Sequence, residues 1–319
     1  MIYLITSIGS MSAEAVIQEI KKTTDAKIIG CNLHPKSWTA SSRLVDKFYQ
    51  IAPFSEKEIY LSEIKKIIKK EKIEIIIPLT DPEVDIFSEH YDDFISIGAR
   101  PYISNKTSIK IARDKFLLSE FFKEKNIPTI PTIVGKMGEK IHFNYPLIAK
   151  KQKGRSSQGN IIIDDQRAFD FYKKIIFSKE YIIQPYIPGD IYVVDIVRQA
   201  DGRSAIPITR QELVRTSNGA GIVVEIKKNK HVCNKLAIDI SNILNIEGCI
   251  NIEFLMAKET PLLMDINPRF SAGVSFSMLA GYNMVNNHLR CFNNKHIDSE
   301  KEILEKIYTR SYQEFVISN

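Results

Sequence analysis

The chain has 319 residues, 44% of them hydrophobic, and a formal net charge of +6 at pH 7. This length and composition suffice for two or three globular domains, each with its own core. The positive charge lies in helical stretches where lysine and glutamate mix, such as residues 63–72, so we expect solvated helix faces and no nucleic-acid partner.

Neither a membrane segment nor a cysteine metal site is expected. No apolar run approaches the roughly 20 residues of a membrane span, and the N-terminus MIYLITSIGS is too short and uncharged for a signal peptide. The four cysteines are scattered, without any CxxC spacing. We therefore expect free thiols in a cytoplasmic protein with no membrane partner, and a homodimer is compatible with the sequence.

Residues 1–107 alternate between strands and helices. The expected strands lie at 2–8, 27–32 and 73–78, and the expected helices at 12–22 and 55–71. This alternation is typical of a parallel sheet covered by helices on both faces, so we predict a small α/β domain. A ligand of this domain would lie at the carboxyl ends of the strands, near Ser7, Gly9, Thr80, Asp81 and Glu83.

The pattern changes after residue 107. A single helix is expected at 108–126, ended by Pro128. Further strands are expected at 146–151, 160–163, 181–184 and 191–198, and a helix at 166–178. Hairpins thus replace the alternation of strands and helices seen in residues 1–107. This change predicts α+β structure with antiparallel sheets.

A polar loop follows the apolar strand that ends near Lys150. The loop, residues 154–159, reads GRSSQG, and its backbone amides could turn toward phosphate oxygens while Lys150 supplies a positive charge. The Walker pattern GxxxxGK[ST] is absent, and a plain hairpin turn would look much the same. Lys115, at the opening of a helix, could equally be a surface lysine.

Residues 248–273 carry the most informative pattern in the chain. Two strand-length apolar runs, 249–256 and 261–266, flank a short polar turn and predict an antiparallel hairpin. On it, Asp265 and Asn267 share a face, and Glu253 can meet them from the partner strand. Oxygen ligands alone suit Mg²⁺, although an ordinary hairpin with exposed acids would also fit.

Several segments in this order resemble the ATP-grasp superfamily, most closely its stand-alone ligases similar to half of the carbamoyl-phosphate synthase large subunit. The matching segments are IIIPLTDPEVDIF (75–87), ISNKTSIKIARDKFLLSEFFKEKNIPTIPT (103–132), PLIAKKQKGRSSQGNIII (146–163), YIIQPYIPGDIYVVDIV (181–197), GCINIEFL (248–255) and LLMDINPRFSAG (262–273). The resemblance covers nearly the whole chain, and INPRF is its most specific piece. It implies a pre-ATP-grasp α/β domain at 1–107, an N-terminal lobe or lid at 108–187, and a C-terminal lobe with the metal site at 188–319.

The resemblance also implies roles for individual residues. Lys115 and Lys150 would contact the ATP phosphates, and the loop with Ser156, Ser157 and Gly159 would close over them. The adenine edge would be bound by backbone groups of Gln184, Pro185, Tyr186 and Ile187. Two Mg²⁺ ions, replaceable by Mn²⁺, would be held by Glu253, Asp265 and Asn267. The substrate carboxylate and its acyl phosphate would be held by Arg210, Arg215 and Arg269, and the catalytic set would be Arg269, Arg210 and Lys150.

Three positions depart from the family pattern. Pro185 stands where an acidic residue is common, and Asp265 is shorter than the usual glutamate. Ile191 replaces a ribose-binding glutamate, which leaves Asp190 for that contact.

The implied activity is ATP-dependent ligation of a small carboxylic acid, such as an amino acid or a sugar acid, to an amine. The acid would form an acyl phosphate before the amine displaces phosphate. This chemistry needs charge neutralisation more than a nucleophilic side chain. Two other outcomes stay open: carboxylation or phosphorylation by an ATP-grasp enzyme, and a nucleotide-binding module that has lost catalysis.

Overall fold

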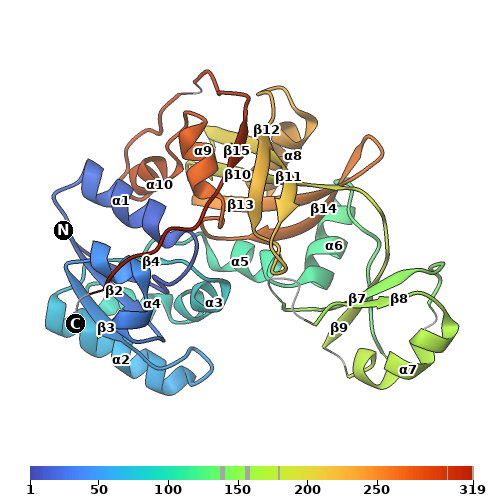
Figure 1. The fold of residues 1–319 in the computed structure, drawn as a ribbon, viewed down its shortest axis with the longest axis horizontal. Coiled ribbons are helices and arrows are strands. Elements are labelled where there is room, and N and C mark those ends of the chain that lie inside the picture. The colour runs from blue at the N-terminus through green and yellow to red at the C-terminus, as the bar shows by residue number, and fades with distance from the viewer. Residues whose placement is uncertain (137–140, 155–158, 179, 300, 318–319) are drawn as a thin grey trace.

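The computed structural model describes residues 1–136, 141–154, 159–178, 180–299 and 301–317. Three β-sheets follow one another along the chain (Figure 1). None of the helices in these ranges is long and apolar enough to cross a membrane.

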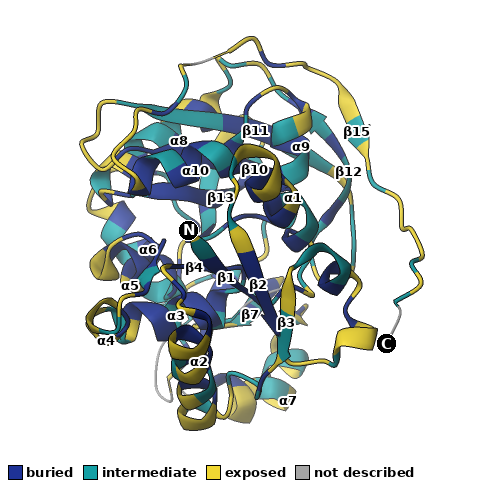
Figure 2. Ribbon diagram, turned by 90° about the vertical axis from the view of Figure 1, so that its left-hand side faces the viewer, coloured by how far each residue is buried: buried dark blue, intermediate teal, exposed yellow. Residues whose placement is uncertain are grey.

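The first sheet is parallel throughout, as the sequence predicts; its strand order is β3-β2-β1-β4-β5, and β3 and β5 are additional to the three expected strands. Its strands are β1 (Ile2–Thr6), β2 (Lys27–Asn32), β3 (Lys47–Gln50), β4 (Ile75–Pro78) and β5 (Arg100–Pro101). Its helices are α1 (Ala13–Thr23), α2 (Lys57–Glu71), α3 (Asp81–Glu89) and α4 (Tyr91–Ser96), with short 3-10 turns η1 (Lys36–Trp38) and η2 (Ala40–Leu44). Because side chains alternate along β1, Tyr3 and Ile5 pack on the side of α1, while Leu4 packs with α2 and α3. Both faces are therefore covered, and the outer face of α2 stays exposed (Figure 2).

The single helix expected at 108–126 is wrong. Two helices, α5 (Lys106–Ala112) and α6 (Lys115–Lys123), occupy this region. The break comes at Asp114, whose extended backbone lets its carboxylate accept hydrogen bonds from the amides of Phe116 and Leu117. An aspartate that caps a new helix ends the preceding one, a competition that apolar periodicity does not reveal.

The second sheet is antiparallel, in the order β6-β9-β7-β8. It is formed by β6 (Ile133–Val134), β7 (Leu147–Lys151), β8 (Ile161–Ile163) and β9 (Tyr181–Pro185), with α7 (Gln166–Ile176) on one face. Its buried cluster draws only on residues of this region: Leu147, Ala149, Ile163, Ile176, Tyr181 and Ile183. We call the segment 133–185 the small lobe.

The third sheet has six strands in the order β14-β13-β10-β11-β12-β15, and its neighbours pair antiparallel. The strands are β10 (Asp190–Arg198), β11 (Ala205–Arg215), β12 (Gly221–Ile226), β13 (Gly248–Ala257), β14 (Thr260–Asn267) and β15 (Ile307–Thr309). The helices α8 (Val232–Ile243), α9 (Val274–Leu279) and α10 (Met284–Phe292) complete this part. The hairpin predicted between residues 249 and 266 is confirmed as β13 and β14.

The three sheets span residues 2–101, 133–185 and 190–309, within the predicted segments 1–107, 108–187 and 188–319. Helices α5 and α6, however, contribute Ile111, Leu118 and Phe122 to a buried cluster with the third sheet and α8. Their apolar side chains thus pack with the third sheet, while the start of α6 is hydrogen-bonded to Gln152 of the small lobe. The domain boundaries themselves stay a prediction.

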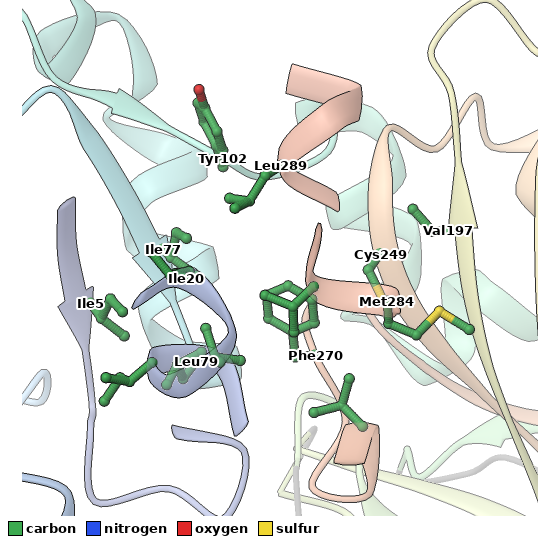
Figure 3. Packing of buried hydrophobic residues seen from close by; sticks show 14 of the residues in the cluster. Ile5, Ile20, Ile77, Leu79, Tyr102, Val197, Cys249, Phe270, Met284 and Leu289 are labelled. Carbon is green, nitrogen blue, oxygen red and sulfur yellow. The ribbon is translucent and has the colours of Figure 1, made fainter. Parts of the chain in front are cut away.

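The first and third sheets share one continuous core. Ile5, Ile77 and Leu79 from the first sheet lie in the same buried cluster as Phe270 and Met284 (Figure 3). Tens of buried side chains packed at crystal-like density resist relative movement. The N-terminal domain and the third sheet thus form one rigid base.

His288 on α10 is buried in this base beside Tyr102 and Phe270. Its Nδ1 accepts a hydrogen bond of 2.9 Å from the Cys249 amide, so the neutral ring carries its proton on Nε2. Gly248 lies against the ring: a Cβ there would sit 2.6 Å from Nδ1. Burial lowers the pKa of His288 from its usual 6.5 to about 3.

The stability of the fold should therefore depend on His288 below neutral pH. Its folded pKa lies below the unfolded value, so stability is fully present above pH 6.5 and is lost as pH falls toward 3. Between pH 7 and pH 5 we expect a loss of about 2 kcal/mol from this group. Urea unfolding at both pH values, with His288→Gln as control, measures it. Equal pH dependence in the two proteins would contradict the assignment.

Candidate active site

A cavity of about 630 Å³ lies where the three sheets meet. Its walls come from the loops after β1 and β4, from the small lobe, and from the pocket-facing side of the third sheet. The predicted site residues that line it are Lys115, Lys150, Gln184, Pro185, Tyr186, Ile187, Arg210, Arg215, Glu253, Asp265, Asn267 and Arg269. Residues from both antiparallel sheets thus converge on one space.

The β13–β14 hairpin presents its polar residues to this cavity. Glu253 lies directly opposite Asp265, and Asn251 opposite Asn267. A bulge after Glu253 leaves Met264 without a partner and turns both Met264 and Asp265 toward the pocket. The predicted grouping of Glu253, Asp265 and Asn267 is thus found in the structure.

Each oxygen of this group already has a partner. Asp265 Oδ2 accepts from Lys115 Nζ at 2.7 Å, and Asn267 Nδ2 donates to Glu253 Oε1 at 3.2 Å. Glu253 Oε2 lies 3.5 Å from Arg215 Nη2, and Asn267 Oδ1 accepts from Arg269 Nη2 at 3.2 Å. Burial, followed by the charge of Asp265, raises the pKa of Glu253.

The donor set fits Mg²⁺ better than a softer metal. The described ranges hold no cluster of three or more His, Cys, Asp or Glu side chains that could hold a metal. Two carboxylates and one amide oxygen supply only part of a metal coordination shell. Mg²⁺ commonly takes its remaining ligands from water and substrate phosphates.

The two lysines reach the cavity from different elements of the fold. Lys150, on β7 of the small lobe, has no ion pair among the described residues, and burial followed by the charge of Lys115 lowers its pKa. Lys115 begins α6 on the rigid base and also reaches the Gly154 carbonyl at 3.5 Å. Of the loop, Ser156 and Ser157 lie outside the described residues. Gly159 does not line the cavity, although its neighbour Asn160 does.

The strand β9 carries the predicted adenine-binding segment to the edge of the cavity. Gln184 is buried, and its Nε2 donates to Thr132 Oγ1 at 2.8 Å, while its Oε1 has no partner in the described structure. Apolar side chains surround this end of the cavity: Ile130, Ile148, Ile191, Leu255 and Met264. The environment suits a flat ring with a polar edge.

The expectation for Asp190 is wrong. Asp190 does not line the cavity, and its carboxylate accepts from Gln211 Nε2 at 3.0 Å. Side chains alternate along β10, so Ile191 and Val193 face the cavity and Asp190 faces away. A neighbour in sequence cannot replace Ile191 on the same face of a strand.

The three arginines differ in how firmly they are held. The Arg269 guanidinium donates to Asp81 Oδ2 at 2.7 Å and to the Phe270 carbonyl. Arg215 is part-exposed and donates to the Gly219 carbonyl at 2.8 Å. Arg210 is 2% exposed and lies between two carboxylates. Of the three, Arg210 is the most completely neutralised.

The acids around Arg210 were not predicted as site residues. Asp195 Oδ2 accepts from Arg210 at 2.7 Å and from Ser277 Oγ at 2.7 Å, and Glu212 Oε1 accepts from Arg210 at 2.9 Å. Glu212 also lines the cavity. Asp195 lies on β10 directly before the apolar Ile196, and no motif marks it. Alternation along β11 places Glu212 on the same face as Arg210, whereas the pairing of β10 with β11 is needed to bring Asp195 there.

The N-terminal domain contributes part of the cavity wall. Gly9, Thr80 and Asp81 line the cavity as expected, whereas Ser7 and Glu83 do not. Glu83 is buried instead, and it accepts hydrogen bonds from Tyr60 and Thr80 at 3.0 and 2.8 Å. Asp81 could have been ranked higher from the sequence, because it follows a strand in the PxxD segment 78–81.

Two family profiles match the chain. The profile described as "ATP-grasp in the biosynthetic pathway with Ter operon" matches residues 177–315, the region that holds the hairpin and the three arginines. Residues 177–315 are therefore identified as an ATP-grasp domain. The profile "PylC-like, N-terminal domain" matches residues 3–102, which correspond to the first sheet.

Curated relatives agree with this family. The large chain of carbamoyl phosphate synthase from Clostridium acetobutylicum is 25% identical over 282 residues, which cover 83% of this chain and 26% of the relative. The large chain from Saccharolobus solfataricus is 23% identical over 252 residues, which cover 73% of this chain and 24% of the relative. The chain thus spans about a quarter of the length of the curated relatives that it matches.

Solved ATP-grasp structures share the fold. The biotin carboxylase of Campylobacter jejuni superposes with a TM-score of 0.78 at 15% identity, covering 97% of this chain and 75% of that one. The N5-carboxyaminoimidazole synthetase of Staphylococcus aureus, solved with ADP, gives a TM-score of 0.76 at 14% identity, covering 95% and 80%. At such low identity the likeness concerns the fold alone.

The buried pair of Asp195 and Arg210 should matter for folding. Asp195→Ala would remove one of the two carboxylates that neutralise the buried Arg210 guanidinium. We expect the free energy of unfolding to fall by about 3 kcal/mol. Asp190→Ala is the matched control on the same strand, and should cost less than about 0.5 kcal/mol because Asp190 is exposed. Denaturant unfolding measures both. Similar losses in the two variants would show that the buried ion pair does not contribute to the free energy of unfolding.

Proposed function

We propose that the chain is an ATP-dependent ligase that joins a small carboxylic acid to an amine through an acyl phosphate. The observation that carries the proposal is the meeting of two lysines, three arginines and the Glu253, Asp265 and Asn267 group in one cavity. Phosphoryl transfer depends on positioning and on neutralising negative charge, and this set supplies both.

ATP would enter with its base between the small lobe and the third sheet. The backbone of residues 184–187 and the free Gln184 Oε1 offer hydrogen-bonding groups for the adenine edge, beside the apolar wall of Ile148 and Leu255. Ile191 provides no ribose acceptor on the cavity face. The ribose would therefore be held less firmly than the base and the phosphates.

The phosphates would extend toward Lys150 and Lys115. Glu253, Asp265 and Asn267 would hold two Mg²⁺ ions, for which Mn²⁺ could substitute, and the ions would supply the charge that neutralises the transferring group. The glycine-bounded loop 154–159 would cover the phosphates. Excluding water protects an acyl phosphate from hydrolysis.

The substrate acid would lie at the end of the cavity that faces the N-terminal domain. Arg215 and Arg269 are the better candidates for its carboxylate, because Arg210 is enclosed by two acids. A guanidinium can hold a carboxylate in two parallel hydrogen bonds and offset its repulsion from the γ-phosphate. The amine would then attack the acyl carbon, form the C–N bond and release phosphate.

Labelled oxygen tests the reaction. A screen of amino acids and sugar acids, each with amine or bicarbonate, would first identify the pair that stimulates phosphate release. An acid labelled with ¹⁸O in its carboxylate should then transfer one label to the released phosphate. Amine-dependent turnover without label transfer would rule out the acyl phosphate, and turnover that needs bicarbonate instead of amine would indicate carboxylation.

The hairpin acids should be essential for turnover. Asp265→Ala should lower the rate of ADP release by roughly 100-fold or more, because it removes a group that would hold the metal charge beside the transferring phosphate. Glu259→Ala, an exposed acid in the turn of the same hairpin, is the matched control and should leave the rate unchanged. Mg²⁺-dependent ADP release is the measurement. If Asp265→Ala kept most of its activity, the hairpin would not be the metal site.

A further inference from the structure

The three oxygen ligands proposed for the metals are each covered by a cation of the chain itself. Lys115 lies 2.7 Å from Asp265, Arg215 lies 3.5 Å from Glu253, and the Arg269 Nη2 donates to Asn267 at 3.2 Å. These cations are the groups that the proposed function assigns to phosphates and substrate. The residues proposed to bind the metals are thus in contact with the residues proposed to bind the phosphates and the substrate.

The contact between Lys115 and Asp265 is the tightest of the three and also well shielded. The two side chains are 12% and 18% exposed, so water screens their attraction only partly. The other oxygen of Asp265 accepts from the Ile266 amide at 3.1 Å. Both oxygens of this carboxylate are therefore occupied by the chain.

We propose that Lys115 is the resident counter-ion of Asp265, and that it moves from this carboxylate to an ATP phosphate when a divalent cation takes its place. The inference rests on the proposed function, because it needs both a metal and a nucleotide site in this cavity. It adds that metal binding and nucleotide binding are coupled, because both require the Lys115 ammonium to leave the Asp265 carboxylate.

The coupling follows from simple charge balance. A divalent cation alone would have to displace the Lys115 ammonium while no anion is present to receive it, so two positive groups would stay close together. ATP alone could draw Lys115 away, but it would leave the charge of Asp265 unbalanced beside the phosphates. Each ligand therefore binds weakly by itself and favours the other, which is positive linkage between the two.

The experiment measures divalent-ion binding directly and needs no substrate. Mn²⁺ replaces Mg²⁺ as the probe, and its binding is followed by electron paramagnetic resonance with and without a non-hydrolysable ATP analogue. The affinity of Mn²⁺ for the analogue in solution is measured separately and subtracted. In the wild-type protein we expect the analogue to raise the affinity of the site for Mn²⁺ by roughly 10-fold or more, within the usual range of such coupling.

Lys115→Met removes the ammonium while keeping the length of the side chain. It should bind Mn²⁺ roughly 10-fold more tightly than the wild type when no nucleotide is present, bind the analogue more weakly, and lose most of the coupling. Lys151→Met is the matched control: Lys151 also lines the cavity but forms no ion pair within the described ranges. It should leave the affinity for free Mn²⁺ within about twofold of the wild type.

Two results would overturn the inference. One is an unchanged affinity for Mn²⁺ in Lys115→Met. The other is an equal gain in Lys151→Met, which would indicate a general effect of net charge. Thermal unfolding checks each variant, and Lys115→Gln is the second variant if Lys115→Met does not fold. A wild-type protein that bound neither Mn²⁺ nor the analogue would instead contradict the proposed function.

Discussion

The cavity depends on one buried ion pair between the N-terminal domain and the third sheet. Asp81, at the first position of α3, is 1% exposed and accepts a hydrogen bond of 2.7 Å from Arg269. Burial alone would raise the pKa of Asp81, but the charges of Arg269 and Arg113 outweigh it and hold that pKa below its usual value. The carboxylate is therefore ionised, and breaking the pair would leave a buried charge uncompensated.

This ion pair is part of a larger connection. Arg113, at the end of α5, lies 3.9 Å from Asp81 and donates hydrogen bonds from its Nε and Nη2 to the Asp85 carboxylate. One turn of α3 therefore fixes both the arginine of the hairpin and the helix that precedes Lys115. Lys115 and Arg269 are thus positioned by the same acidic helix, although they are 154 residues apart.

Local patterns in the sequence were enough to predict most of the fold. Period-two alternation in β13 and β14 was sufficient to predict that Glu253, Asp265 and Asn267 share a face, because that depends only on strand pairing. In the N-terminal domain, apolar runs were enough to predict β1, β2, β4, α1 and α2, but not the short strands β3 and β5 or the helices α3 and α4. The resemblance supplied Lys115 and Lys150, which no local pattern separates from surface lysines.

The errors have different causes: strand alternation that was not applied at Asp190, a competing local hydrogen bond at Asp114, and otherwise a partner remote in sequence. Asp190 was assigned to the cavity by its nearness to Ile191, although strand alternation turns it away. The ion pairs of Arg210 with Asp195 and of Lys115 with Asp265 span 15 and 150 residues. Such contacts are set by sheet register, which a single sequence does not encode locally.

The small lobe has a core of its own, and this bears on the thermodynamics of closure. Its buried cluster contains no residue of the other two sheets, and it joins the third sheet through the short segment 186–189. At Gly189 a Cβ would lie 2.3 Å from the Met256 carbonyl, so the chain passes here in close contact with β13. A rigid-body swing about this segment would keep the apolar contacts within this cluster intact. The heat-capacity change of nucleotide binding would then report the surface that the ligand itself covers, with little contribution from the lobe.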